Sequence, residues 1–368
     1  MEIKMKRKII SSALAAVTIT YALFASPVSS TVCLAAEEPE AVAAASDVKV
    51  SSRIFELLFG KREKEEKEVY LIPGGEVFGA KIKQSGVTVT DVADGITPLC
   101  IGDRICSING EEISSCEEAR RLIDECDGKE IEVRVMRGGE RVTLRITPRS
   151  SGGGYKLGVA LKDGAAGIGT VTFINPEDKS FGGLGHGICD AETGEIIELA
   201  EGRVTSVILG GVERGECGKP GELRGVLTGK VKGHLYSNNE CGVFGVLDNI
   251  ESTANPIPVG RKSDLHTGKA NIISTVKGSL TASYSIEITD IDYASDGTKS
   301  FSIKVTDPDL IALTGGIVRG MSGSPIIQDG KLVGAVTHVL VADPTEGYGI
   351  FIENMLNAAK SEALPKAA

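Results

Sequence analysis

The sequence predicts a mainly β protein with more than one domain, and three features of the composition lead to that prediction. The chain has 368 residues, of which 46 are glycine and none is tryptophan, and aromatic residues make up only 4%. Short runs rich in Val, Ile and Thr alternate with Gly, Asn and Asp turns over most of its length. Such runs are typical of strands, and a chain of this length has room for two domains.

Residues 1–36 have the pattern of a leader sequence. A basic cluster lies between Lys4 and Lys8, and no charged residue occurs from Ile9 to Ala36. A basic start followed by an apolar stretch predicts a signal peptide or an uncleaved signal-anchor helix. We therefore expect export across a membrane, with the protein anchored by the leader or released after processing. Residues 37–68, which end in a run of mixed charge, are predicted to be a linker.

The charge and the cysteine spacing exclude two classes of partner. The net charge is −10, so the chain offers no basic surface for nucleic acid. None of the eight cysteines forms a Cys-x-x-Cys pair, which argues against a zinc site. We expect free, mostly buried thiols that act as small apolar side chains. No metal or cofactor is predicted.

Residues 69–149 are predicted to form one small domain. The alternating residues Val87–Val92 predict a strand, and Gly102–Ile113 predict two strands joined by an Asn-Gly turn. Ser114 or Ser115 is expected to cap a following helix, and a hairpin is expected over 131–146. This order of elements resembles a PDZ domain of the bacterial-protease type.

The PDZ resemblance implies a peptide-binding site near the start of this domain. The residues at the position of the family's carboxylate-binding loop are Val77, Phe78, Gly79 and Ala80. The adjoining strand Lys81–Lys83 would then accept a peptide by strand addition. A domain of the same fold that binds no peptide is the alternative. Residues 150–154, Ser-Ser-Gly-Gly-Gly, are predicted to be a flexible joint to the next domain.

Residues 155–368 are predicted to be a second, larger β domain. Many short strands separated by turns, with few helical patterns, favour a sandwich or paired barrels. A helix is expected near the end of the chain, over Ile352–Lys360.

A Gly- and Ser-rich turn around Ser322 is the strongest candidate for chemistry. Gly320 and Gly323 bracket Ser322 and allow backbone angles that a Cβ would forbid. Such a turn can present a nucleophilic hydroxyl, and the N–H groups of Gly320 and Ser322 are the predicted oxyanion hole. The stretch resembles the nucleophile loop of chymotrypsin-like peptidases. A β-turn with incidental serines is the alternative interpretation.

A serine nucleophile needs a base, and the chain has four histidines. His186 is flanked by glycines in a turn from which its ring can project into a cleft, and it is the predicted base, with a core or surface histidine of no catalytic role as the alternative. His234 and His266 lie in polar stretches and are interpreted as surface residues. His338 follows an apolar strand and is predicted either to shape a specificity pocket or simply to pack within its strand.

The third member of a triad is an acid that orients the imidazole. Asp190, Asp307 and Asp309 are the candidates, and their spacing alone does not choose between them. Asp190 is close enough to His186 in sequence to make only a turn hydrogen bond.

Several motifs, taken in order, resemble the stage IV sporulation protein B family of serine peptidases. They are Gly167–Thr170, Phe181–Asp190, Glu240–Gly245, Thr306–Pro308, Gly315–Ile326, Val333–His338 and Tyr348–Ile350. The resemblance implies an N-terminal membrane segment, a PDZ domain and a chymotrypsin-like peptidase domain of two β-barrels. It also implies a triad of His186 as base, Asp307 as acid and Ser322 as nucleophile.

The resemblance further implies a serine endopeptidase of endospore formation. Such an enzyme is exported across the forespore membrane into the intermembrane space and cleaves a membrane-bound regulatory protein there. The cut would release intramembrane proteolysis and activate a late sigma factor, while the PDZ domain docks a peptide and gates self-processing. The alternatives are a general envelope quality-control protease and a catalytically inactive PDZ adaptor.

Overall fold

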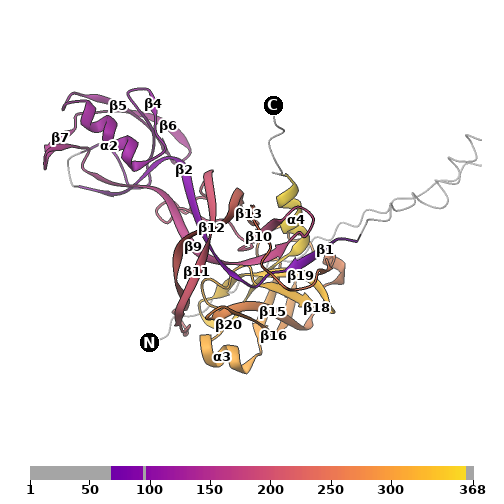
Figure 1. Cartoon of the computed structure of the whole chain (residues 1–368). Coiled ribbons are helices and arrows are strands. Elements are labelled where there is room, and N and C mark those ends of the chain that lie inside the picture. The colour runs from indigo at the N-terminus through magenta and orange to yellow at the C-terminus, as the bar shows by residue number, and fades with distance from the viewer. Residues whose placement is uncertain (1–67, 94–96, 362–368) are drawn as a thin grey trace, which may run out of the picture. The chain divides into compact units, whose positions relative to one another are not determined.

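Antiparallel strands, arranged as two rings and one smaller domain, make up most of the fold (Figure 1). The computed structural model describes residues 68–93 and 97–361, so the predicted leader and nearly all of the predicted linker lie outside it. The described residues belong to one structural unit that begins at Lys67. Within this part of the chain, no helix has the length and apolar character needed to cross a membrane.

The first ring closes because β2 pairs with a neighbour along each of its edges. Its strands, in order around the ring, are β9 (Val159–Ile174), β10 (Ser180–Gly183), β13 (Gly242–Leu247), β12 (Glu222–Asn239), β11 (Leu199–Glu213) and β2 (Val77–Val92). Two short strands, β1 (Tyr70–Pro73) and β14 (Ile257–Pro258), continue the sheet beside β9. Phe78, Phe181 and Val243 fill its interior.

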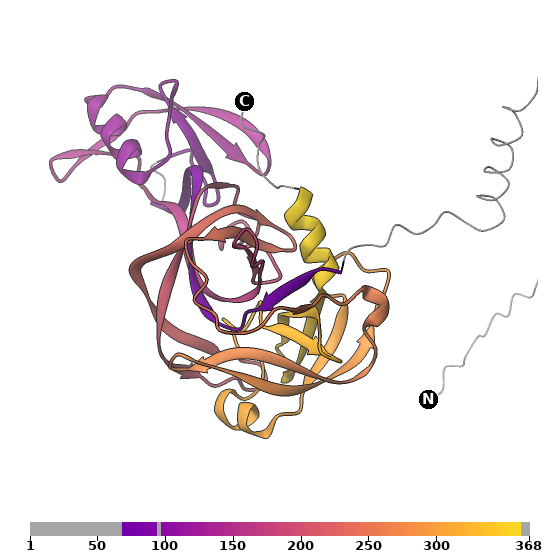
Figure 2. The same ribbon diagram turned by 45° about the vertical axis from the view of Figure 1, so that its right-hand side comes forward.

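The second ring is a closed barrel, coloured orange to yellow in Figure 2. Its strands, in order, are β15 (Gly268–Lys277), β16 (Leu280–Ile291), β17 (Phe301–Val305), β20 (Asp343–Phe351), β19 (Lys331–Leu340) and β18 (Pro325–Gln328). A 3₁₀ turn η1 (Lys262–Asp264) precedes it, α3 (Pro308–Thr314) follows β17, and α4 (Ile352–Ser361) follows β20. The predictions of a mainly β fold with paired barrels and of a final helix are confirmed.

The smaller domain has the element order that the sequence predicts. It comprises the second half of β2, then β3 (Arg104–Ile108), β4 (Glu111–Glu112), α2 (Cys116–Glu125), β5 (Ile131–Arg137), β6 (Glu140–Ile146), β7 (Arg149–Ser151) and β8 (Gly154–Lys156). Asn109 and Gly110 both have positive φ, 51° and 83°, as the predicted turn requires. Ser115 is the residue that caps α2, because its hydroxyl accepts the Glu118 N–H.

The boundaries of this domain differ from the predicted ones. Its apolar core begins at Val87 and continues to Leu157, whereas residues 77–83 pair within the first barrel. Residues 150–154 are not a flexible joint, because β7 and β8 form a hairpin there. Tyr155 ties that hairpin to α2 through its N–H, which donates to Asp124 at 2.8 Å. The two long strands β2 and β9 therefore belong to both the first barrel and the smaller domain. Local sequence composition does not predict that one strand belongs to two domains.

The cysteines of the described residues are free, as expected, but they are less buried than expected. Cys100, Cys189 and Cys217 are exposed, and the other four are half-buried. Burial raises the pKa of the half-buried Cys116 and Cys241 thiols, which keeps them protonated at neutral pH.

Candidate active site

The turn that carries Ser322 is held against the first barrel. Gly320 and Gly323 have φ values of 97° and 94°, in a region that glycine adopts without strain. A Cβ on Gly323 would lie 2.1 Å from the carbonyl oxygen of Thr170. Thr170 donates its N–H to the Ser322 carbonyl at 3.0 Å and its hydroxyl to the Gly320 carbonyl at 2.8 Å. Strand β9 of the first barrel therefore fixes the turn of the second.

The same turn leaves two main-chain donors unused. The N–H groups of Met321 and Gly323 donate to main-chain carbonyls. Those of Gly320 and Ser322 have no acceptor among the described residues. An oxyanion hole requires nearby donors that are free to bind a developing negative charge. The assignment of Gly320 and Ser322 to this role stays a prediction, and the hydrogen bonding of the turn is compatible with it.

His186 lies in a tight turn that follows β10. Leu184 and Gly185 have positive φ, 66° and 68°. The imidazole Nδ1 lies 2.9 Å from the carbonyl oxygen of Gly187. With its proton on Nδ1, the ring donates to that carbonyl and leaves Nε2 able to accept a proton. Burial lowers the pKa of His186, and the Gly187 carbonyl opposes this effect only in part. The ring is therefore kept in its neutral, basic form.

Strand β19 brings the neighbourhoods of His186 and Ser322 together. The Ser322 hydroxyl donates to the carbonyl oxygen of Thr337 at 2.9 Å. The next residue, His338, packs its ring against His186 with the ring centroids 5.2 Å apart. A Cβ on Gly185 would lie 2.9 Å from the Thr337 side chain. The predicted nucleophile and the predicted base thus contact two consecutive residues of β19, Thr337 and His338 respectively.

Asp307, the predicted acid, has a different set of partners. Its carboxylate accepts the N–H groups of Asp309 (3.1 Å) and Leu310 (3.0 Å) and thereby caps α3. It also accepts the N–H of Ser285 at 3.2 Å.

The strand register separates this carboxylate from the His186 ring. His338 is paired with Tyr348, and Tyr348 with Ser302. Asp307 lies five residues beyond Ser302, with two of those five past the end of β17, and its carboxylate faces the start of α3 and Ser285. The structure does not bring Asp307 to the imidazole, and its role as the orienting acid stays a prediction.

The other candidate acids also lie away from the His186 ring. Asp190 accepts the N–H groups of Glu192 and Thr193, the turn bonding that its position predicts, and it pairs with Lys162 at 3.3 Å. Asp309 lies exposed in the first turn of α3. In the described residues the polar contact of the His186 ring is therefore a main-chain carbonyl.

Of the remaining histidines, two lie on the surface, as the sequence predicts, and the third lies beside His186. His234 and His266 are exposed, and His266 pairs with Asp329 at 2.8 Å. His338 is half-buried beside His186, and its Nδ1 has no partner among the described residues. Burial, followed by the nearby His186 and Lys299, lowers the pKa of His338 to about 4. His338 thus lies beside the catalytic candidates, where a specificity residue is expected.

The predicted peptide-binding stretch of the PDZ domain is wrong. Val77, Phe78, Gly79 and Ala80 belong to β2, which pairs with β9 over these residues and with β11 at Gly79 and Ala80. Phe78 and Ala80 are buried in the core of the first barrel. The adjoining residues Lys81–Lys83 are also paired on both edges. No strand edge is left there for a peptide, because the segment is part of the peptidase barrel.

A better candidate for the peptide site is a cavity between α2 and the start of β9. This cavity of about 330 Å³ is lined by Ile123 from α2 and by Leu157, Val159 and Leu161. Val159–Lys162 pair with β2 along one edge, and in the described residues no strand pairs with the other. The Gly-rich turn Gly152–Gly154 borders the same cavity. The sequence signal for this cavity is the glycine run directly before an apolar segment, the stretch that is predicted above to be a joint.

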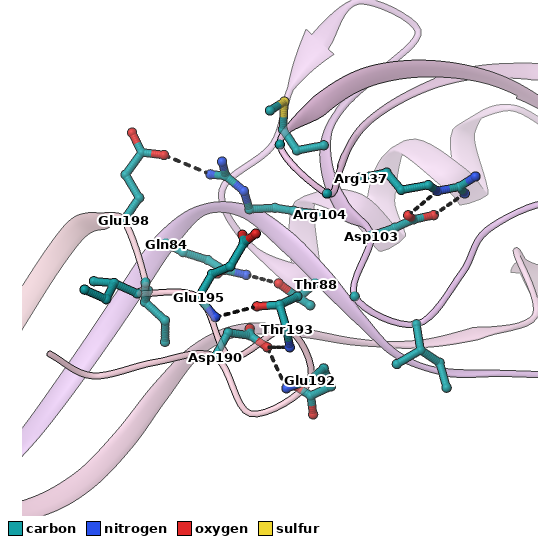
Figure 3. A pocket seen from close by; sticks show the side chains of 17 residues that line it. Gln84, Thr88, Asp103, Arg104, Arg137, Asp190, Glu192, Thr193, Glu195 and Glu198 are labelled. Carbon is teal, nitrogen blue, oxygen red and sulfur yellow. Dashed lines mark hydrogen bonds and ion pairs between the residues drawn. The ribbon is translucent and has the colours of Figure 1, made fainter. Parts of the chain in front are cut away.

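A second cavity, of about 350 Å³, lies beside the loop that follows His186 (Figure 3). On the PDZ side, buried Asp103 holds Arg137 through two hydrogen bonds, at 2.7 and 2.6 Å. Arg104 of β3 pairs with Glu198 of the loop at 3.2 Å. Because Lys162 of β9 pairs with Asp190 at the other end, both ends of the loop are tied to strands that also build the PDZ domain.

Comparisons with known proteins give one family over most of the described chain. The family model "SpoIVB peptidase S55" matches residues 153–356, which is more than half of the chain, and a PDZ-domain model matches residues 61–147. A comparison with curated proteins found no significant match.

Similar solved structures include a PDZ domain and two proteases. The PDZ domain of an SdrC-like protein from Listeria monocytogenes has 24% identity, with 22% of this chain and 92% of that one covered and a TM-score of 0.21. The active form of the Rv3671c protease from M. tuberculosis has 12% identity, coverages of 55% and 77%, and a TM-score of 0.33. The HtrA-type protease AlgW with a decapeptide has 11% identity, coverages of 78% and 64%, and a TM-score of 0.34.

The barrels, the nucleophile turn and the smaller domain define a serine peptidase that carries a PDZ domain. The chain belongs to the SpoIVB peptidase S55 family. It is therefore a serine endopeptidase, and peptides or proteins are its substrates.

Proposed function

We propose that this chain is a signalling endopeptidase of endospore formation. It is exported across the forespore membrane into the intermembrane space and cleaves a membrane-associated regulator there. The cut triggers intramembrane proteolysis and so activates a late sigma factor. The family match over residues 153–356 carries this proposal. The basic and then apolar residues 1–36 support export and membrane attachment.

The proposed reaction is acyl transfer through Ser322. Nε2 of His186 takes the hydroxyl proton while the Ser322 oxygen attacks a peptide carbonyl. The N–H groups of Gly320 and Ser322 stabilise the oxyanion, and His186 returns the proton to the leaving amine. Water then hydrolyses the acyl-enzyme by the same steps. The contact of Ser322 with Thr337 and that of His186 with His338, two consecutive residues of β19, support this pairing.

We propose that the PDZ groove docks an extended peptide from the target or from the enzyme's own chain. The unpaired edge of Val159–Lys162 supplies main-chain hydrogen bonds for strand addition. Leu157 and Ile123 provide an apolar pocket beside it, and the glycine turn supplies N–H groups for a terminal carboxylate.

The groove has a direct structural connection to the active site, which supports a gating role. Leu161 lines the groove, and the next residue, Lys162, pairs with Asp190 and Glu192 in the loop after His186. A peptide added to β9 would act on this contact without touching His186. Such a coupling lets peptide docking alter the position of the base and so gate cleavage, including self-processing near the N terminus.

Sporulation and regulator cleavage test the proposed function together. In an endospore-forming host, the native gene is replaced by wild type, Ser322→Ala or the control Ser324→Ala. We expect Ser322→Ala to block both regulator cleavage and spore formation, with both retained in the control. Normal sporulation with Ser322→Ala would contradict the proposal. Envelope-stress sensitivity without a sporulation defect would favour the quality-control alternative.

The gating step is tested with Lys162→Met and with Lys81→Met, a control on the exposed face of β2. We expect both variants to bind a PDZ peptide with the wild-type Kd. Only Lys162→Met should lose the effect of that peptide on kcat/KM for a separate substrate. An unchanged effect of the peptide on both variants would show that this contact does not transmit docking.

A further inference from the structure

His338 and Lys299 lie on the same face of the second barrel, next to the catalytic candidates. His338 of β19 is directly opposite Tyr348 of β20, so their side chains project from the same side of the sheet. The Lys299 ammonium lies over the Tyr348 ring, 5.2 Å from its centroid. The loop that carries Lys299 is held in place because Thr337 donates its hydroxyl to the Thr298 carbonyl at 2.7 Å.

His338 has hydrogen-bonding capacity that the fold does not use. Its Nδ1 is buried and has no partner among the described residues. Proteins satisfy most buried polar atoms, and the exceptions gather at functional positions. The preceding residue, Thr337, accepts the Ser322 hydroxyl through its main-chain carbonyl, so His338 lies next to the proposed nucleophile.

Among the described residues, the charged group that acts on the His338 ring is the Lys299 cation, because His186 is neutral. The titratable groups that act on its ring are His186, from the loop after β10, and Lys299, from the loop before β17. The packed neighbour from β20 is Tyr348, a neutral phenol. In the described part of the chain no carboxylate forms an ion pair with Lys299, and none contacts either imidazole. The chain as a whole has a net charge of −10, so a cation without a paired carboxylate next to an imidazole is a local exception to the acidic character of the protein.

We propose that His338 and Lys299 form a subsite for an acidic side chain of the substrate, close to the scissile bond. The inference rests on the peptidase activity and adds a substrate feature to it. A Glu or Asp carboxylate would accept a hydrogen bond from the His338 ring and pair with the Lys299 ammonium. Lys299 is exposed, so the subsite lies open to solvent on one side.

Binding a carboxylate favours the protonated form of the His338 ring. The preference for an acidic side chain should therefore increase as the pH falls. His186 must be neutral for cleavage of any peptide, and its titration affects acidic and neutral substrates equally. The ratio of the two rates cancels this shared dependence and isolates the subsite.

The test uses matched peptides that differ only by Glu or Gln. The full chain is given a peptide it cleaves, and Glu and Gln are placed in turn at each of the positions flanking the cut. We expect about a tenfold higher kcat/KM for Glu at one position, equivalent to one charge-assisted contact. The preference should grow between pH 7.5 and pH 5.5.

Two variants and one control assign the preference to these residues. Lys299→Met and His338→Phe should each reduce the Glu-to-Gln ratio toward one, whereas Lys277→Met, at an exposed turn of the same barrel, should keep it. Binding of the same peptides to Ser322→Ala provides a second readout that does not need turnover. Equal rates for Glu and Gln at every position in the wild type would overturn the subsite but not the peptidase. Cleavage of no peptide at all would overturn both.

Discussion

The hydroxyl of Ser322 donates to the main-chain carbonyl of Thr337 at 2.9 Å, one residue before the ring that packs on His186. The predicted nucleophile is thus hydrogen-bonded to a strand carbonyl in this conformation, and the next residue of that strand contacts the predicted base. A carbonyl accepts the proton's hydrogen bond but cannot remove the proton. Activation therefore requires the Ser322 side chain to turn from Thr337 to the imidazole, a rotation between staggered rotamers.

Ser322→Ala should abolish peptide cleavage while the protein stays folded. Alanine fits the half-buried position, and the lost hydrogen bond lowers the free energy of unfolding by about 1 kcal/mol. Cleavage of a labelled peptide should fall by several orders of magnitude. The matched control is Ser324→Ala, which loses a buried hydrogen bond to Ser274 but no proposed catalytic group. Equal activity losses in the two variants would mean that Ser322 has no special role.

Asp307 is tested by comparing two substitutions. Asn caps a helix as well as Asp does, so Asp307→Asn should leave the free energy of unfolding nearly unchanged. Asp307→Ala should lower it by about 1 kcal/mol, because α3 loses its cap. The kcat/KM of the Asn variant then shows whether Asp307 has a second role. Full activity of Asp307→Asn would show that Asp307 only caps α3. A loss of several orders of magnitude in Asp307→Asn, with no such loss in Asp190→Asn, would establish Asp307 as the orienting acid.

As the pH is lowered, kcat/KM should fall with a midpoint below the ordinary histidine pKa of about 6.5. A general base acts in its neutral form, and burial lowers the pKa of His186. Activity is therefore expected to fall as the pH drops through this lowered pKa, with the midpoint of the fall below pH 6.5. The measurement is kcat/KM for a neutral peptide between pH 4 and pH 8. A midpoint above 6.5 would contradict the description of a buried, neutral base.

Stability should also decrease toward acid, and His338 should contribute to that decrease. In the unfolded chain this ring binds a proton near pH 6.5, whereas in the folded protein it does so near pH 4. The unfolded state thus binds more protons between these values, so the free energy of unfolding falls as the pH drops from 6.5 toward 4. Urea unfolding at pH 7 and pH 5 should show a smaller difference in His338→Phe than in the wild type. The surface control His234→Phe should match the wild type.

The PDZ groove is tested by charge reversal at its edge. Lys156 is exposed and lines the groove beside the glycine turn. We expect Lys156→Glu to weaken binding of a peptide with a free C-terminal carboxylate, because it places a negative charge near the bound anion. Arg145→Glu, on the exposed strand β6, serves as the control. Binding that is unaffected by Lys156→Glu and by amidation of the peptide would place the ligand elsewhere.

Local patterns predicted the individual elements well. The Asn-Gly turn at 109–110, the Ser-capped helix α2 and the final helix α4 all depend on residues within one or two turns of each other. The sequence also holds a signal for α3, with Asp307 at the N-cap and Pro308 at the start of the helix. This short helix was not predicted, because an Asp-Pro pair is also common in turns.

The sequence predictions failed where the structure depends on contacts between residues far apart in the chain. Val77–Ala80 has glycine and apolar residues in a pattern that suits a binding loop as well as a barrel strand. Only the pairing of β2 with both β9 and β11 excludes the loop. The contact between His186 and His338 spans many residues and has no local signature. The sequence therefore supplied the candidates for base and nucleophile, but it did not predict their contacts with the Thr337 carbonyl and the His338 ring.

The most direct test of the account is the site of covalent modification by a fluorophosphonate, mapped by mass spectrometry on the full chain. A phosphonate adduct on Ser322, lost in His186→Ala and kept in His234→Ala, is the predicted result. An adduct on a different serine, or labelling of Ser322 that does not depend on His186, would contradict it.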